Sequence, residues 1–265
     1  MQLRGKTVIV TGGAAGIGKA LAQRLRQEEV RGLAIADIDG AGAAAVAREL
    51  DALGLQCDVT REQDIRRVVE QTRREWGEVD VFCSNAGLIR LDPDRESAAS
   101  APDEDFELCW RVHVMAHVYA ARALLPAMIA RGSGYFLNTV SAAGLLNQIG
   151  SATYSTTKHA ALGFAESLAI THRNHGIRVS VLCPQAVRTA LYGDAPEAAA
   201  AAADGVLSPE QVADAAVAGI RDERFLILPH PQVSEYLRRK ASDYERWISG
   251  MARWRQKVMA GPEPG

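Results

Sequence analysis

Short apolar segments alternate with stretches of helical periodicity along almost the whole chain. The expected strands lie at residues 7–10, 33–36, 55–57, 79–83, 135–141, 178–183 and 225–228. The expected helices begin near residues 17, 41, 62, 105, 154 and 209. Strands that are apolar on both faces and separated by helices form βαβ units, in which the strands are parallel and helices cover both faces of the sheet. We therefore expect a doubly wound α/β fold of about seven strands in a single domain.

The length and composition fit one core with a short helical extension. A chain of 265 residues with 48% hydrophobic content buries enough surface for one well-packed core, which we assign to residues 1–229. Beyond Pro229, apolar side chains recur at helical intervals. Residues 230–265 are therefore expected to form a helical extension that packs on the domain or on a sister subunit, with 261–265 fraying.

Charge and hydropathy argue against several classes of partner. The formal net charge is −2, so no field of the whole protein favours nucleic acid or an anionic membrane. No apolar run approaches the ~20 residues that span a bilayer, and the N-terminus lacks the layout of a signal peptide. We expect a cytoplasmic protein without nucleic-acid or membrane partners.

The cysteines indicate neither disulfides nor a metal site. Cys57, Cys83, Cys109 and Cys183 are widely spaced and form no C-x-x-C pair. Such residues in apolar surroundings are typical of buried free thiols in a reducing compartment.

Tyr154 and Lys158 form the most informative pair in the chain. Four residues apart on an expected helix, their side chains emerge on one face. A phenol with a pKa of roughly 10 needs a neighbouring cation to act near neutral pH, and we expect Lys158 to lower the pKa of Tyr154 by about three units. Tyr236 and Lys240 repeat the spacing, but no strand ending in a hydroxyl precedes them as Ser141 precedes Tyr154. We interpret the second pair as ordinary helix-surface residues.

A glycine-rich loop joins the first expected strand to the first helix. Residues 11–18 carry Gly12, Gly16 and Gly18, a spacing that departs from the Gly-x-Gly-x-x-Gly fingerprint. Missing β-carbons let the backbone approach a pyrophosphate, and the helix that follows directs its free N–H groups toward phosphates. Asn85-Ala-Gly87, after the fourth strand, offers another close backbone approach. The loop predicts a nucleotide site.

Asp37 indicates which nucleotide binds. It closes the second strand about twenty residues after the glycine loop, where a carboxylate accepts hydrogen bonds from ribose hydroxyls. A 2′-phosphate there would meet like charge, and Ala14, Ala15 and Ile38 supply no compensating cation. NAD is therefore favoured over NADP. Asp58, after the third strand, is placed to accept a hydrogen bond from the adenine amino group.

Together these residues resemble the short-chain dehydrogenase/reductase family, in its compact subfamily of roughly 250 residues. The likeness extends from Gly5 to about Pro229. The matching motifs are Thr11-Gly12-x-x-x-Gly16-x-Gly18, Asn85-Ala86-Gly87, Ser141, Tyr154-x-x-x-Lys158, and Pro184 with Thr189.

The resemblance implies a Rossmann-like fold and hydride transfer between a carbinol carbon and NAD. It implies that Ser141 and Tyr154 hold the substrate oxygen, that Tyr154 transfers the proton, and that Lys158 binds the nicotinamide ribose. The cofactor-binding residues that we expect are Gly12, Ala15, Gly16, Ile17, Gly18, Asp37, Ile38, Asp58, Val59, Asn85, Ala86, Gly87, Tyr154, Lys158, Pro184, Gln185, Val187 and Thr189.

Two positions depart from the family pattern. The family usually has an asparagine, whose main-chain carbonyl holds a water that links the lysine to solvent, where this chain has His113. His113 then keeps the relay through its carbonyl, joins it through its imidazole, blocks it, or is merely structural. The family's usual Pro-Gly is Pro184-Gln185 here, which brings an amide close to the nicotinamide.

We expect an NAD-dependent secondary-alcohol dehydrogenase or ketone reductase that forms a homodimer or homotetramer. The expected substrate pocket is apolar and suits a bulky hydrophobic, aromatic or steroid-like alcohol. Its residues are Ala143, Leu145, Leu146, Ile149, Gln185, Leu191 and Tyr192, with Trp247 a further candidate. Residues 188–205 are expected to form a mobile flap above it. The alternatives are an inactive NAD-binding sensor or scaffold and an epimerase or dehydratase; the latter is disfavoured because its relatives carry a larger C-terminal domain.

Overall fold

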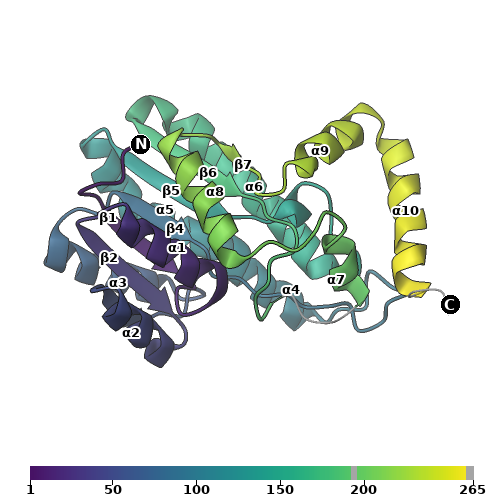
Figure 1. The fold of residues 1–265 in the computed structure, drawn as a ribbon, viewed down its shortest axis with the longest axis horizontal. Coiled ribbons are helices and arrows are strands. Elements are labelled where there is room, and N and C mark those ends of the chain that lie inside the picture. Colours follow the sequence, from purple (N-terminus) through teal and green to yellow (C-terminus); the bar gives the residue numbers. More distant parts are fainter. Residues whose placement is uncertain (192–195, 261–265) are drawn as a thin grey trace.

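A seven-stranded parallel sheet forms the centre of the molecule, with the strand order β3-β2-β1-β4-β5-β6-β7. The computed structural model describes residues 1–191 and 196–260 (Figure 1). The strands are β1 (Thr7–Thr11), β2 (Gly32–Asp37), β3 (Leu53–Gln56), β4 (Val81–Ser84), β5 (Gly134–Thr139), β6 (Ile177–Leu182) and β7 (Leu226–Ile227). The expected doubly wound fold is confirmed. The order reverses between β1 and β4, the place where such sheets bind ligands.

Helices cover both faces of the sheet (Figure 1). The helices α1 (Gly16–Gln27), α2 (Gly40–Glu49) and α8 (Pro209–Arg221) pack on one face around a buried apolar cluster. The other face carries α3 (Glu62–Trp76), α4 (Asp103–Trp110), the π-helix η1 (Arg111–Met115), α5 (Ala116–Ala130) and α6 (Ala152–His172), with a second cluster beneath them.

The continuous helical segment from Asp103 to Ala130 corrects one expectation from hydropathy. Among the described residues, it is the one helix long and apolar enough to cross a membrane by length and composition, and half of its most apolar window is buried. Its buried side chains Val112, Ala116 and Leu124 belong to the apolar cluster that packs on the sheet. This burial is what the core helix of an α/β sheet requires.

The strand that was expected to end at Ser141 ends at Thr139 instead. Ser141 has a φ of 79°, in the left-handed region that no strand residue adopts, and it precedes the 3₁₀ helix η2 (Ala142–Gly144). The apolar pattern of the sequence does not predict this turn, because the residues on both sides of Ser141 are buried.

The C-terminal segment forms two helices beyond the edge of the sheet, α9 (Gln232–Ser242) and α10 (Tyr244–Ala260) (Figure 1). Val233 of α9 is fully buried in the apolar cluster beside α6. Helix α10 runs back alongside α7 (Pro196–Ala201), which lies within the segment expected to be a flap. The interpretation of Tyr236 and Lys240 as ordinary surface residues is wrong, because Lys240 is only 9% exposed and both side chains bond to other elements.

Candidate active site

Asn85 joins the carboxyl ends of three neighbouring strands. Its side-chain amide donates to the carbonyl oxygen of Thr11 at 3.2 Å, and its side-chain oxygen accepts from the hydroxyl of Thr139 at 3.1 Å. Its own backbone N–H donates to the Thr11 hydroxyl at 3.0 Å. These bonds hold the ends of β1, β4 and β5 in one fixed arrangement, from which the remaining side chains of the site project.

Ser141 presents its hydroxyl at the end of β5. The Ser141 Oγ accepts a hydrogen bond from the backbone N–H of Ala143 at 3.2 Å and donates to the carbonyl oxygen of Pro184 at 3.4 Å. A non-glycine residue with positive φ stores backbone strain, which persists only where surrounding contacts fix it and which concentrates at functional sites.

Tyr154 and Lys158 lie one turn apart in α6, with their side chains on one face of the helix as expected. Both are almost completely buried, at 9% and 2% exposed. The Lys158 Nζ lies 5.5 Å from the centroid of the Tyr154 ring and donates to the carbonyl oxygen of Thr139 at 2.8 Å. The sheet therefore orients the ammonium beside the phenol.

The expectation that Tyr154 has an acidified phenol is wrong for this structure. Burial raises the pKa of Tyr154, and a hydrogen bond between the Ser141 and Tyr154 side chains opposes this shift without cancelling it. Burial also lowers the pKa of Lys158 to about 8. Both groups are thus displaced toward their neutral forms, because removal from water penalises each charge separately.

His113 lies in the π-helix and both of its ring nitrogens are bonded. Its Nε2 accepts from the backbone N–H of Leu88 at 3.3 Å, so the ring proton lies on Nδ1, which contacts the hydroxyl of Thr157 at 2.8 Å. Burial, followed by the charge of Lys158, holds the pKa of His113 well below its usual value. The imidazole is therefore a neutral bridge between the 85–88 segment and α6, and single-turn π segments of this kind recur at functional sites.

His117, one turn further along, was not singled out in the sequence. It is 3% exposed, and neither ring nitrogen has a hydrogen-bond partner among the described residues. Burial lowers its pKa to about 3, with a smaller contribution from Lys158. The side chain is therefore an uncharged polar group in an apolar interior, which costs stability.

The glycine loop approaches its neighbours so closely that side chains are excluded. A β-carbon on Gly18 would lie 1.9 Å from the carbonyl oxygen of Gly12, and one on Gly12 would lie 2.8 Å from the Cα of Ala86. Gly16, with a φ of 53°, faces the side chain of Thr189. The expected cofactor segments at 12–18, 85–87 and 189 are thus brought together, because glycine at these positions lets the segments approach one another closely.

Two carboxylates lie at the ends of β2 and β3. The Asp37 carboxylate accepts from the backbone N–H of Ala14 and of Asp39, both at 3.0 Å, which fixes it against the glycine loop. Ile38, next to it, is 69% exposed. Asp58 uses its Oδ1 to accept from the backbone N–H and the hydroxyl of Thr60, at 2.9 and 2.7 Å. Asp37 is thus held against the glycine loop, whereas Asp58 is held by the turn that precedes α3.

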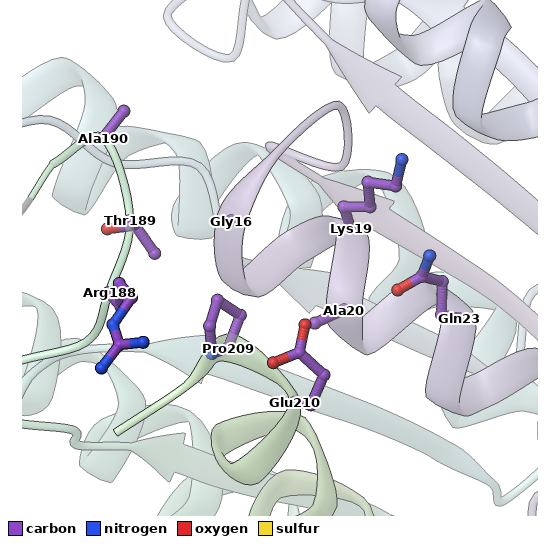
Figure 2. Close-up of a pocket in the computed structure, with 9 residues that line it drawn as sticks. All are labelled: Gly16, Lys19, Ala20, Gln23, Arg188, Thr189, Ala190, Pro209 and Glu210. Carbon is purple, nitrogen blue, oxygen red and sulfur yellow. The ribbon is translucent and has the colours of Figure 1, made fainter. Parts of the chain in front are cut away.

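A hollow of about 300 Å³ lies beside the glycine loop (Figure 2). Gly16 and Thr189, two of the expected cofactor residues, line it, while Lys19 and Arg188 bring positive charge to its wall. None of the expected substrate residues lines this hollow. Glu210 adds a carboxylate to the same wall, so the charges that line the hollow are mixed.

The expected substrate residues gather around η2, with exceptions. Ala143, Leu145, Leu146 and Ile149 are all at most 8% exposed, and Trp247 of α10 packs against the same apolar cluster as Leu145 and Leu146. Leu191 is 44% exposed, and Tyr192 lies outside the described residues. Gln185 joins the site through its backbone N–H, which donates to Nδ1 of His230 at 3.2 Å. Its side-chain oxygen is buried and has no partner among the described residues, so it is free to accept from a ligand.

Thr139 and Thr157 are site residues that sequence reasoning missed. Thr139 orients Lys158 through its carbonyl oxygen, and Thr157 bonds the ring of His113. Thr157 lies within the Tyr154-x-x-x-Lys158 spacing itself, so its place on the helix was a signal that could have found it. Among the described residues, no group of His, Cys, Asp and Glu is arranged to hold a metal ion.

A doubly wound sheet with a glycine loop at its switch point, and with a hydroxyl, a phenol and an ammonium at the ends of β5 and β6, defines a nucleotide-binding oxidoreductase. The family profile described as short chain dehydrogenase matches residues 6–200. The chain belongs to the short-chain dehydrogenase/reductase family, whose members bind a nicotinamide cofactor and act on CH–OH groups.

Two individual relatives match 94% and 72% of this chain. The chain is 33% identical over 255 residues to 1-deoxy-11-beta-hydroxypentalenate dehydrogenase of Streptomyces exfoliatus, covering 94% of this chain and 92% of that protein. It is 34% identical over 201 residues to secoisolariciresinol dehydrogenase of Forsythia intermedia, covering 72% and 69%. A short-chain dehydrogenase/reductase from Burkholderia phymatum, solved in complex with NAD, superposes with a TM-score of 0.82 at 25% identity, covering 92% and 96%.

Proposed function

We propose that this protein interconverts a secondary alcohol and a ketone by hydride transfer to or from NAD, with Tyr154 as the acid–base residue. The observation that carries the proposal is the arrangement of Ser141, Tyr154 and Lys158, three groups from two elements at one end of the sheet. Oxidation is the preferred direction in our proposal, because cells keep NAD mostly oxidised.

Each residue has a distinct task in this proposal. Ser141 and Tyr154 donate hydrogen bonds to the substrate oxygen, where negative charge builds during hydride transfer. Tyr154 takes the alcohol proton in oxidation and returns it in reduction. Lys158, oriented by Thr139, supplies a positive charge that counters the effect of burial on the phenol. NAD, when bound, supplies the hydride acceptor and a positively charged ring, which also favours a phenolate nearby.

Asp37 supports NAD as the cofactor rather than NADP. Its carboxylate is fixed by two backbone N–H groups, and the exposed neighbour Ile38 offers no cation for a 2′-phosphate. The solved relative from Burkholderia phymatum holds NAD, and a 3-ketoacyl-(acyl-carrier-protein) reductase from Brucella melitensis was solved with NADH.

The apolar residues around η2 support a bulky hydrophobic substrate. Leu145, Leu146 and Ile149 offer no charged group to a ligand, so apolar contact would supply most of the binding free energy. Two of the relatives are named as dehydrogenases of 1-deoxy-11-beta-hydroxypentalenate and of secoisolariciresinol.

The proposal is tested by NADH formation across a panel of hydrophobic secondary alcohols. The native protein should turn over at least one of them, and Tyr154→Phe should lose at least about 100-fold in kcat, within the range typical for a proton-transfer group. Turnover by neither protein would favour the alternative, an inactive NAD-binding sensor or scaffold. We further propose a cytoplasmic location. We also propose a homodimer or homotetramer, and light scattering tests this oligomeric state.

A further inference from the structure

Tyr236 and Lys240, one turn apart on α9, point into the molecule rather than into solvent. Residues at i and i+4 lie on the same helix face, so both side chains extend from one side of α9. The Tyr236 hydroxyl donates to Oδ1 of Asp204 at 2.9 Å. The Lys240 ammonium donates to the carbonyl oxygen of Leu145 at 2.7 Å. The proposed hydride transfer uses neither side chain.

The Lys240 ammonium is held by polar partners that carry no negative charge. Besides Leu145, it donates to Nε2 of His159 at 3.3 Å and lies 5.6 Å from the ring centroid of Tyr244. His159 donates from Nδ1 to the carbonyl oxygen of Ser155 at 2.9 Å, so its Nε2 carries the free lone pair that Lys240 needs. A buried ammonium persists only where its hydrogen bonds are made, and bonds from a charged donor are roughly twice as strong as neutral ones.

The two partners of Lys240 belong to the two halves of the proposed catalytic group. Leu145 follows η2 in the loop that begins at Ser141, and His159 directly follows Lys158 on α6. That loop also rests on α6, since a β-carbon on Gly144 would lie 2.7 Å from the carbonyl oxygen of Lys158. Lys240 thus links the loop that begins at Ser141 to helix α6.

Tyr236 contacts a different segment, the one that contains Asp204. Asp204 lies between α7 and α8, near the C-terminal end of the expected flap. A few residues further, Leu207 forms a β-bridge with Val187, which is itself one of the expected cofactor residues. One face of α9 therefore reaches both the serine loop and the segment that follows α7.

We propose that Tyr236 and Lys240 form a clamp, in which these two positioning residues hold the 141–149 loop and the 202–207 segment as opposite walls of the substrate pocket. The inference rests on the proposed function, because it names what orders the pocket for that reaction. When a loop occupies its binding-competent form only part of the time, the apparent affinity for ligand falls by that fraction. Loss of the clamp therefore raises KM for the alcohol and leaves the saturated kcat nearly unchanged.

The test compares Lys240→Met with the matched control Lys257→Met on the exposed face of α10. Methionine keeps the length and apolar stem of lysine and removes the ammonium. For Lys240→Met we expect about tenfold faster hydrogen exchange in the 141–149 loop and about tenfold higher KM for the alcohol, as loss of one or two charge-assisted hydrogen bonds implies. Lys257→Met should behave as the native protein in both measurements.

A second pair of variants keeps the clamp testable if Lys240→Met folds poorly. Tyr236→Phe removes one hydroxyl and should raise KM about threefold, with faster exchange confined to 202–207. Asp204→Asn keeps an oxygen acceptor for Tyr236 and should change neither measurement by more than about twofold.

The exchange measurement needs no turnover, so the two proposals fail separately. If no alcohol is oxidised by the native protein, the proposed function is wrong while loop exchange still decides whether the clamp exists. The clamp is overturned if hydrogen exchange stays at the native rate in 141–149 of Lys240→Met and in 202–207 of Tyr236→Phe. It is also overturned if the exchange rate rises evenly over the whole sheet. Unchanged KM beside faster loop exchange overturns its role in substrate binding.

Discussion

The ring of His113 lies edge-on to the ring of Tyr154, with centroids 5.3 Å apart and planes inclined at 88°. Edge-to-face packing of this kind fixes the orientation of a neighbouring ring. Because hydrogen bonds from Leu88 and to Thr157 already occupy both nitrogens of His113, the imidazole acts as a rigid support for Tyr154.

His113→Asn is therefore expected to retain appreciable turnover, with kcat reduced no more than about tenfold through looser packing of Tyr154. The main-chain carbonyl at this position remains, and the native imidazole is neutral over the working pH range because its pKa lies well below the usual value. The measurement is the pH profile of kcat, whose shape should match that of the native protein. Complete loss of activity, or a displaced limb of the profile, would show that the imidazole itself transfers protons.

Lys158→Met is expected to abolish turnover and to stabilise the protein. Burial lowers the pKa of Lys158 from 10.5 to about 8, which corresponds to a cost of about 3 kcal/mol for holding the ammonium inside the protein below pH 8. Between about pH 8 and 10.5 the unfolded chain binds more protons than the native one, so native stability rises with pH through this window. Lys158→Met does not bury an ammonium, so its free energy of unfolding in urea should exceed that of the native protein by about 1 to 3 kcal/mol at pH 7. This difference should shrink at pH 9.5. A variant less stable than the native protein at pH 7 contradicts the argument.

His117→Leu is expected to make the protein more tolerant of acid. Burial lowers the pKa of His117 from the ordinary value of 6.5 to about 3, so below about pH 6.5 the unfolded chain takes up a proton that the native chain does not. Native stability is therefore lost as the pH falls, by about 2 kcal/mol between pH 7 and 5 from this residue alone. Thermal unfolding at both pH values should show a smaller drop for His117→Leu, whereas His175→Leu, at an exposed site, should show the native drop.

The double variant Asp37→Ser with Ile38→Arg is expected to shift preference toward NADP. The change removes the carboxylate that opposes a 2′-phosphate and adds a guanidinium suited to bind one. The ratio of kcat/KM for NADP over NAD should rise at least about tenfold, since like charges at contact cost more than the 1.4 kcal/mol that corresponds to tenfold. Asp39→Ser is the control, because serine preserves the cap that Asp39 provides to Gly42 at the start of α2. A native protein that already prefers NADP would refute the role assigned to Asp37.

The fold was predictable to the level of topology and weakly predictable at element ends. Apolar strands alternating with helices imply a parallel sheet, and the observed order places the segments after β1 and β4 side by side as expected. The turn at Ser141 and the π-helix at His113 could not be predicted from the sequence, because both depend on backbone dihedrals that the apolar pattern does not encode.

Chain order by itself determined the doubly wound sheet, the glycine loop and the pairing of Tyr154 with Lys158, because periodicity and short spacing act between residues that are close along the chain. Tertiary structure alone decided that the pKa of Tyr154 rises, that Thr139 orients Lys158, and that the second tyrosine–lysine pair bonds to other elements with Lys240 buried. These outcomes depend on desolvation and on partners distant in sequence, such as Leu145 for Lys240. Desolvation and these distant contacts arise only when the chain folds, because folding decides which atoms replace water around each polar group.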